Sequence, residues 1–162
     1  MPKAHKEILQ ALTAGIQSEV ASYVFYLEAM KKNESAKIKS VLERLALDEK
    51  EHFHILERRY DSYVRSEKWN TTADVLRQPG LPEVSEEMNE THRELVTEVA
   101  RSKSLKTILD IAFRLEKEAN ELFDDAAGKA DSKEARTMFE QLARFEEGHM
   151  NLIDGMRAEM VK

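Results

Sequence analysis

The chain has 162 residues, of which 41% are hydrophobic and 35% charged, and its net charge at pH 7 is −6. Because it contains no cysteine, disulfides, thiolate nucleophiles, cysteine-based zinc sites and iron–sulfur clusters are excluded. It has no basic stripe suited to nucleic acid, no apolar run near the ~20 residues of a membrane span and no apolar signal segment, so we expect a cytoplasmic protein without nucleic-acid or membrane partners.

Hydrophobic residues recur at helical spacing through the first 60 residues. One stripe of Ile, Leu and Tyr predicts a helix over residues 4–31. A second stripe starts after a short polar turn, in which Asn33 or Ser35 is a suitable helix cap, and it continues to about residue 60. Two long helices joined by a short turn predict an antiparallel hairpin over residues 4–60.

The helical pattern lapses after this hairpin and then returns. Residues 61–102 lack a sustained stripe and contain a turn at Gln78-Pro79-Gly80-Leu81-Pro82, which predicts a long crossover with one short helix at 85–102. Two further stripes predict a second hairpin over residues 103–160. We therefore expect an all-α fold in a single domain, 1–162: a ferritin-like four-helix bundle made of two hairpins joined by the crossover.

The stretch EKEHFH, residues 49–54, contains two interleaved Glu-x-x-His pairs, Glu49 with His52 and Glu51 with His54. On a helix, residues three apart share a face, so either pair is suited to bind a metal. The offset of two residues turns the pairs about 160° apart, and only one of them can face the core.

An internal repeat separates the two pairs. When the sequence is shifted by 97 positions, the halves align without a gap and their apolar stripes coincide. Three ionisable residues on these stripes then meet identical residues: Glu19 meets Glu116, Glu49 meets Glu146, and His52 meets His149. Glu51 and His54 meet Gly148 and Asn151, so we expect that pair on a solvated surface.

These six repeated residues are predicted to face the core from the middle of four helices. Burying them without compensation costs many kcal/mol, whereas two divalent ions balance the four carboxylates and two neutral imidazoles complete the ligand set. One Glu from each of two helices and Glu-x-x-His from each of the other two are the ligands of dimetal carboxylate bundles. Oxygen and imidazole ligands suit two ions of Fe or Mn, or a mixed Fe/Mn pair, and Zn or Co could also occupy such a site. A metal-free polar network is the structural alternative.

Three more residues are candidates for contacts with these ligands. Tyr23 and Tyr26 lie one and two turns beyond Glu19, where each either packs in the core or donates a hydrogen bond to a ligand. Asp48 precedes Glu49 and is a candidate to orient a histidine, although its counterpart in the second half is Phe145.

With these residues in place, the chain resembles the rubrerythrin-like branch of the ferritin-like superfamily. The resemblance is carried by SEVASYVFYLEAM at 18–30, ALDEKEH at 46–52, AFRLEKEANELFDDAA at 112–127 and LARFEEGH at 142–149. It implies a di-iron enzyme of oxidative-stress defence that reduces hydrogen peroxide while its iron shuttles between diferrous and diferric states. It also implies a homodimer.

Three departures from the related families shape this expectation. Rubrerythrins carry a cysteine-ligated iron domain that supplies electrons, so a chain without cysteine needs a separate electron-donor protein. They also have a further glutamate three residues beyond the ligand of the third long helix, where this chain has Ala119. The haem-binding methionine of bacterioferritins, which the six-ligand pattern also resembles, is Lys50 here, so no haem is expected.

Three functions fit these observations. The first is an oxidoreductase that reduces hydrogen peroxide or O₂ at a carboxylate-bridged dimetal site. The second is a ferroxidase or iron-handling protein, for which Fe(II) is the substrate. The third is a di-iron oxygenase with an organic substrate, which requires an apolar pocket beside the metals.

Overall fold

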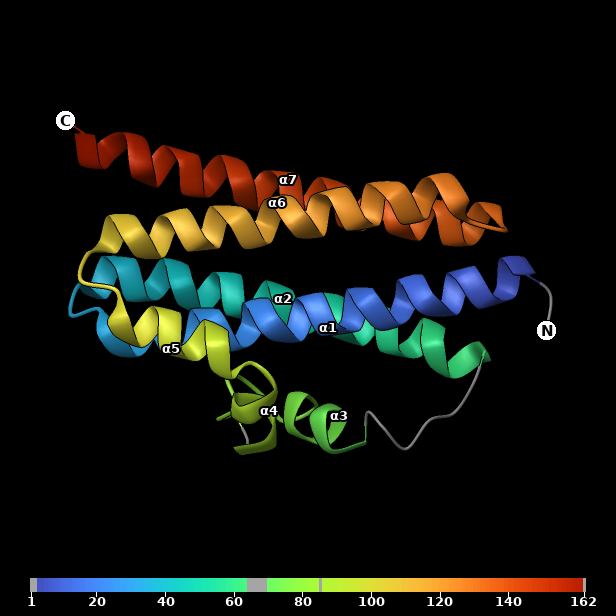
Figure 1. The fold of residues 1–162 in the computed structure, drawn as a ribbon, viewed down its shortest axis with the longest axis horizontal. Coiled ribbons are helices and arrows are strands. Elements are labelled where there is room, and N and C mark those ends of the chain that lie inside the picture. The colour runs from blue at the N-terminus through green and yellow to red at the C-terminus, as the bar shows by residue number, and fades with distance from the viewer. Residues whose placement is uncertain (1–2, 64–69, 85, 162) are drawn as a thin grey trace.

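The computed structural model describes residues 3–63, 70–84 and 86–161, and within these ranges it contains seven helices and no strand (Figure 1). The four long helices are α1 (Lys3–Lys32), α2 (Ala36–Tyr63), α6 (Leu105–Lys129) and α7 (Lys133–Val161). The three short ones are α3 (Asn70–Leu76), α4 (Glu86–Thr91) and α5 (Arg93–Arg101). The predicted all-α, ferritin-like bundle of two hairpins with a long crossover is confirmed.

Serine side chains define the starts of three long helices. The hydroxyl of Ser35 accepts a hydrogen bond from the backbone N–H of Ile38 at 3.4 Å, and that of its repeat counterpart Ser132 accepts from Ala135 at 3.1 Å. Ser104 caps α6 in the same way. Each hydroxyl accepts a hydrogen bond from a backbone N–H that has no partner within its helix. Both hairpin turns therefore end in a serine N-cap.

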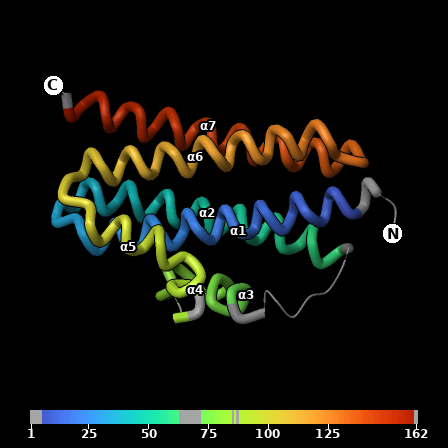
Figure 2. The backbone as a smooth tube through the Cα atoms, viewed as in Figure 1, coloured from blue at the N-terminus to red at the C-terminus, as the bar shows by residue number. Residues whose placement is uncertain are grey.

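The two hairpins meet mainly through one helix from each. α1 packs along α2, α6 packs along α7, and α1 lies beside α6, whereas the backbones of α2 and α7 lie farther apart and their side chains make the contact. Figure 2 shows that the crossover returns the chain along the length of the bundle, so that α6 starts at the end where α2 starts. The hairpins are therefore related by an approximate two-fold rotation, as the sequence repeat requires.

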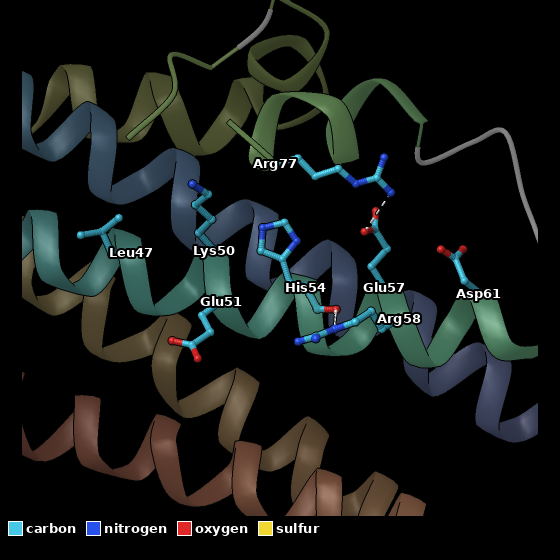
Figure 3. A pocket seen from close by; sticks show the side chains of 8 residues that line it. All are labelled: Leu47, Lys50, Glu51, His54, Glu57, Arg58, Asp61 and Arg77. Atoms are coloured by element: carbon cyan, nitrogen blue, oxygen red, sulfur yellow. Dashed lines mark hydrogen bonds and ion pairs between the residues drawn. The ribbon is translucent and has the colours of Figure 1, made fainter. Parts of the chain in front are cut away.

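Hydrogen bonds from one face of α2 hold the crossover in place (Figure 3). The Lys50 ammonium donates to the backbone carbonyls of Gln78 and Gly80, the latter at 2.9 Å. A ring nitrogen of His54 lies 2.9 Å from the carbonyl oxygen of Leu76, the last residue of α3. The contact of His54 covers a carbonyl that the end of α3 leaves without a helical partner, and those of Lys50 cover carbonyls of the turn that follows α3.

The structure corrects two expectations here. His54 is half-buried against α3 and is not a solvated residue, because its imidazole pairs with the crossover, whereas Glu51 is exposed as expected. The crossover also holds more helix than the one predicted segment at 85–102. That segment is divided at His92, whose backbone leaves helical geometry (φ −109°, ψ 30°). The unpredicted α3 is held by contacts distant in sequence, with Ala73 and Leu76 buried.

None of the helices in the described part of the chain is long and apolar enough to cross a membrane.

Candidate metal centre

The bundle brings together the six ionisable residues that the repeat singles out. α1 carries Glu19, α2 carries Glu49 and His52, α6 carries Glu116, and α7 carries Glu146 and His149. None of the six residues is more than 6% exposed. Four mid-helix positions from two hairpins thus converge in the interior, where ionisable groups are rarely found without a partner.

The ligand atoms form two overlapping groups, each suited to one metal ion. One group is Glu19, Glu49, His52 and Glu146, and the other is Glu49, Glu116, Glu146 and His149. Within each group the ligand atoms all lie within 4.8 Å of one another. Because Glu49 and Glu146 belong to both groups, they are placed to bridge two ions, while Glu19 and Glu116 serve one position each.

Several carboxylate oxygens of the cluster are buried without a hydrogen bond. They are both oxygens of Glu19, both of Glu49 and Oε2 of Glu146. A buried polar atom without a partner costs on the order of 1–3 kcal/mol, and more when it carries charge. These orphaned oxygens point into a space surrounded by hard oxygen and imidazole ligands, so the donor set fits divalent iron or manganese.

Each histidine points Nδ1 at the carboxylates. Nδ1 of His52 lies 3.0 Å from Glu146 and 3.6 Å from Glu19. Nδ1 of His149 lies 3.0 Å from Glu49, within ion-pair distance, and 3.3 Å from Glu116. Burial alone would lower the pKa of His52, but the hydrogen bond to Glu146 and the nearby carboxyl group of Glu49 outweigh it and raise the pKa to about 10. The pKa of His149 is raised for the same reasons, by Glu116, Glu146 and Glu49.

Protonation makes the metal-free cluster nearly neutral. Burial, together with the charges of Glu146 and Glu49, raises the pKa of Glu19 well above its usual value. Burial, with a hydrogen bond to Glu146, raises the pKa of Glu116 to about 7. Two imidazolium cations then face Glu146: burial and the charge of Glu49 act to raise the pKa of this carboxyl group, but hydrogen bonds to Glu116, His149 and His52 outweigh them and lower it. Divalent ions that replace these protons leave the balance of charge unchanged.

The three supporting residues proposed from sequence have different partners. Tyr26 donates its buried hydroxyl to Oε1 of Glu116, and burial, followed by the charges of Glu116 and Glu49, raises the pKa of Tyr26. Asp48 lies 3.0 Å from Nε2 of His149. Tyr23 follows the other alternative: it is buried in the core, and its hydroxyl donates to the carbonyl of Pro82 in the crossover at 2.6 Å and not to a ligand.

One neighbour of the cluster was not predicted. The ring of Phe145 lies 5.1 Å from that of His52, centroid to centroid, at an interplanar angle of 56°. Helical periodicity places Phe145 beside the apolar stripe, where it remains 55% exposed. The sequence contained one signal for this contact: Phe145 aligns with Asp48 when the two halves of the repeat are compared.

The family comparison agrees with this geometry. A family model described as rubrerythrin matches residues 10–157, which is most of the chain. The chain belongs to the rubrerythrin family. No curated protein sequence and no solved structure matches it. The rubrerythrin assignment and the buried carboxylate–histidine cluster together fit a di-iron site.

The positions where this rubrerythrin departs from the related families have clear structural surroundings. Ala119, which stands where rubrerythrins have an additional glutamate, is buried in α6. Lys50, which stands where bacterioferritins have a haem ligand, points toward the crossover and binds its carbonyls (Figure 3). Both positions are therefore occupied by side chains with structural roles.

Proposed function

We propose that the chain is a non-haem di-iron oxidoreductase that reduces hydrogen peroxide or O₂ with electrons from a separate donor protein. The observation that carries this proposal is the pair of overlapping four-residue groups, buried, symmetric and balanced in charge for two divalent ions. When bound, two iron ions would supply redox equivalents and polarise the O–O bond of the oxidant.

The protein residues have distinct tasks in this proposal. Glu49 and Glu146 would hold both ions at a short separation, while Glu19 with His52 and Glu116 with His149 would complete the two positions. The hydroxyl of Tyr26 fixes the orientation of Glu116, and burial of the whole cluster excludes bulk water. A surface pocket lined by Asp48, Phe145 and His149 lies where α2 and α7 separate, and it supports entry of a small oxidant from this side.

Metal analysis and rapid-mixing kinetics test the proposal. We expect anaerobically loaded protein to bind two Fe(II) per chain and to be oxidised faster by hydrogen peroxide or by O₂ than the double variant His52→Ala/Glu146→Ala, which should bind little iron. The matched control is Glu51→Ala/His54→Ala, the other Glu-x-x-His pair of α2, which should retain the metal. Less than one metal per chain, with no loss of thermal stability on chelation, would overturn the dimetal assignment.

The same preparation distinguishes an oxidoreductase from an iron-handling protein. An oxidoreductase should consume peroxide repeatedly when an electron-transfer protein, such as rubredoxin reduced with dithionite, is supplied. If the protein oxidises many equivalents of added Fe(II) per chain and releases or stores the product, iron is the substrate and the proposed reaction is wrong.

A further inference from the structure

The repeat that builds the cluster is broken at two positions that touch the ligands. Tyr26 and Asp48, both in the first hairpin, correspond at the same offset of 97 to Phe123 and Phe145 in the second. The six ligand positions are identical in the two halves, but these supporting positions are polar in one half and aromatic hydrocarbon in the other. The cluster is therefore symmetric in its ligands and asymmetric in its surroundings.

Both polar residues support ligands of the opposite hairpin. Tyr26 donates its hydroxyl to Oε1 of Glu116, and Oδ2 of Asp48 lies 3.0 Å from Nε2 of His149. Glu116 and His149 belong to the same four-residue group. One metal position thus has a hydrogen-bonded carboxylate and a histidine whose outer nitrogen is bound by an anion.

The other position has no such support. Both oxygens of Glu19 are buried without a hydrogen bond. Nε2 of His52 forms no hydrogen bond with any residue that the structure describes, and the ring of Phe145 lies beside the imidazole at 5.1 Å. The second aromatic residue, Phe123, is fully buried and packs against Gly15, one helical turn before Glu19. The half-site of Glu19 and His52 therefore has the ring of Phe145 beside its histidine, and the ring of Phe123 lies one helical turn from its glutamate.

A hydrogen bond to the outer nitrogen of a metal-bound histidine fixes the ring and makes the inner nitrogen a stronger ligand. Loss of such a bond typically lowers metal affinity 10- to 100-fold. A carboxylate ligand held by a tyrosine hydroxyl is likewise oriented before the metal arrives, so less conformational freedom is lost on binding.

We infer that the two metal positions are unequal: the position formed by Glu49, Glu116, Glu146 and His149 fills first and empties last, and Asp48 and Tyr26 are the positioning residues responsible. This inference rests on the dimetal function proposed above. It adds that a one-metal form of the protein exists, with the ion on the His149 side.

Titration of the metal-free protein with Co²⁺, followed by visible absorption and equilibrium dialysis, tests the inference. The wild-type protein should bind two ions in two steps whose dissociation constants differ by at least about 10-fold. His52→Ala should retain the tighter step, whereas His149→Ala should retain the weaker one. Two equal steps in the wild-type protein would overturn the inference and leave the dimetal site intact, while no binding at all would overturn both.

Variants of the positioning residues give a second, independent readout. Asp48→Ala should weaken the first step about 10- to 100-fold and bring the two steps together, and Tyr26→Phe should act in the same direction. Phe145→Asp places a carboxylate opposite His52, at a half-exposed position that tolerates it, and should tighten the second step. The control Glu51→Ala removes a similar charge from the exposed face of α2 and should change neither step. If Asp48→Ala weakens the second step or neither step, the assignment of Asp48 is wrong.

Discussion

Replacement of Glu19 by glutamine should stabilise the metal-free protein while weakening its metal binding. Glutamine has the same shape as protonated glutamate, so the packing of α1 is preserved. Its amide also donates hydrogen bonds, as a protonated carboxyl does, toward the buried oxygens of Glu49 and Glu146. The substitution removes the free-energy cost of holding a proton on the buried carboxyl group of Glu19.

The size of the effect follows from the pKa of Glu19. Burial raises this pKa well above the ordinary value of 4.5, so the folded, metal-free protein holds a proton on Glu19 at pH values at which the unfolded chain has released it. Between 4.5 and the folded pKa, the free energy of unfolding therefore falls as pH rises, by about 1.4 kcal/mol for each pH unit. This loss of stability is small at pH 5, which is close to 4.5, and larger at pH 7. Glutamine does not pay this cost at any pH.

Urea unfolding of chelator-treated protein measures the difference. Glu19→Gln should exceed the wild-type free energy of unfolding, and the excess should be larger at pH 7 than at pH 5. The matched control is Glu43→Gln, an exposed residue of α2, which should stay within about 0.5 kcal/mol at both pH values. A Glu19→Gln protein that is no more stable than the wild type at pH 7, or whose gain in stability is the same at pH 5, would refute this reasoning. Either result would show that the metal-free cluster does not hold an additional proton on Glu19.

Three further predictions follow from other parts of the structure. Metal binding should release protons from the two histidines and from Glu19 and Glu116, because the pKa of each is raised in the metal-free protein. Calorimetry in buffers of different ionisation enthalpy counts these protons, and release near zero would contradict the protonated cluster. Gly15→Ala should destabilise the protein by about 1–2 kcal/mol, because the new Cβ would lie 2.9 Å from Phe123 and 3.1 Å from Leu56, which are both fully buried. This clash outweighs the gain of about 1 kcal/mol in helix propensity. Thermal melts should show a change of the opposite sign for Gly155→Ala, because the Cβ there would enter open space. Lys50→Met should speed limited proteolysis within residues 70–84, because the crossover carbonyls of Gln78 and Gly80 lose their hydrogen-bond donor. The number of bound metal ions should stay at the wild-type value. Unchanged cleavage would show that Lys50 does not hold the crossover.

The four long helices were predictable because a pattern of residues within each helix determines how that helix packs. A stripe of apolar residues at helical spacing, ended by a polar turn with a serine cap, determines both the helix and the face that it buries. The predicted 4–31 compares with Lys3–Lys32, and Ser35 caps the next helix as expected. The shared offset of 97 then related the hairpins without any structural information.

The crossover was less predictable because tertiary contacts determine it. The segment Asn70–Leu76 contains two threonines and an aspartate, which are weak helix formers, and no extended stripe. It is helical because Ala73 and Leu76 are buried and because His54 pairs with the carbonyl of Leu76. A solvated surface was therefore a reasonable expectation for His54 from its own helix alone, and it failed because α3 covers that face.

The same distinction separates what was found in the metal centre from what was missed. The ligands were found because each occupies a core position on its own helix, and the repeat shows which acids and histidines do so twice. The contacts of Tyr23 and Tyr26 depend on how one hairpin lies against its surroundings, and no helical pattern encodes this. Tyr26 faces α6 and reaches Glu116, whereas Tyr23, three residues earlier, faces the crossover and reaches Pro82. The ligands are identical in the two halves of the repeat, but the residues beside them differ at Tyr26 and Asp48. Such differences make the two halves of a symmetric bundle unequal, and here both of them favour the same metal position.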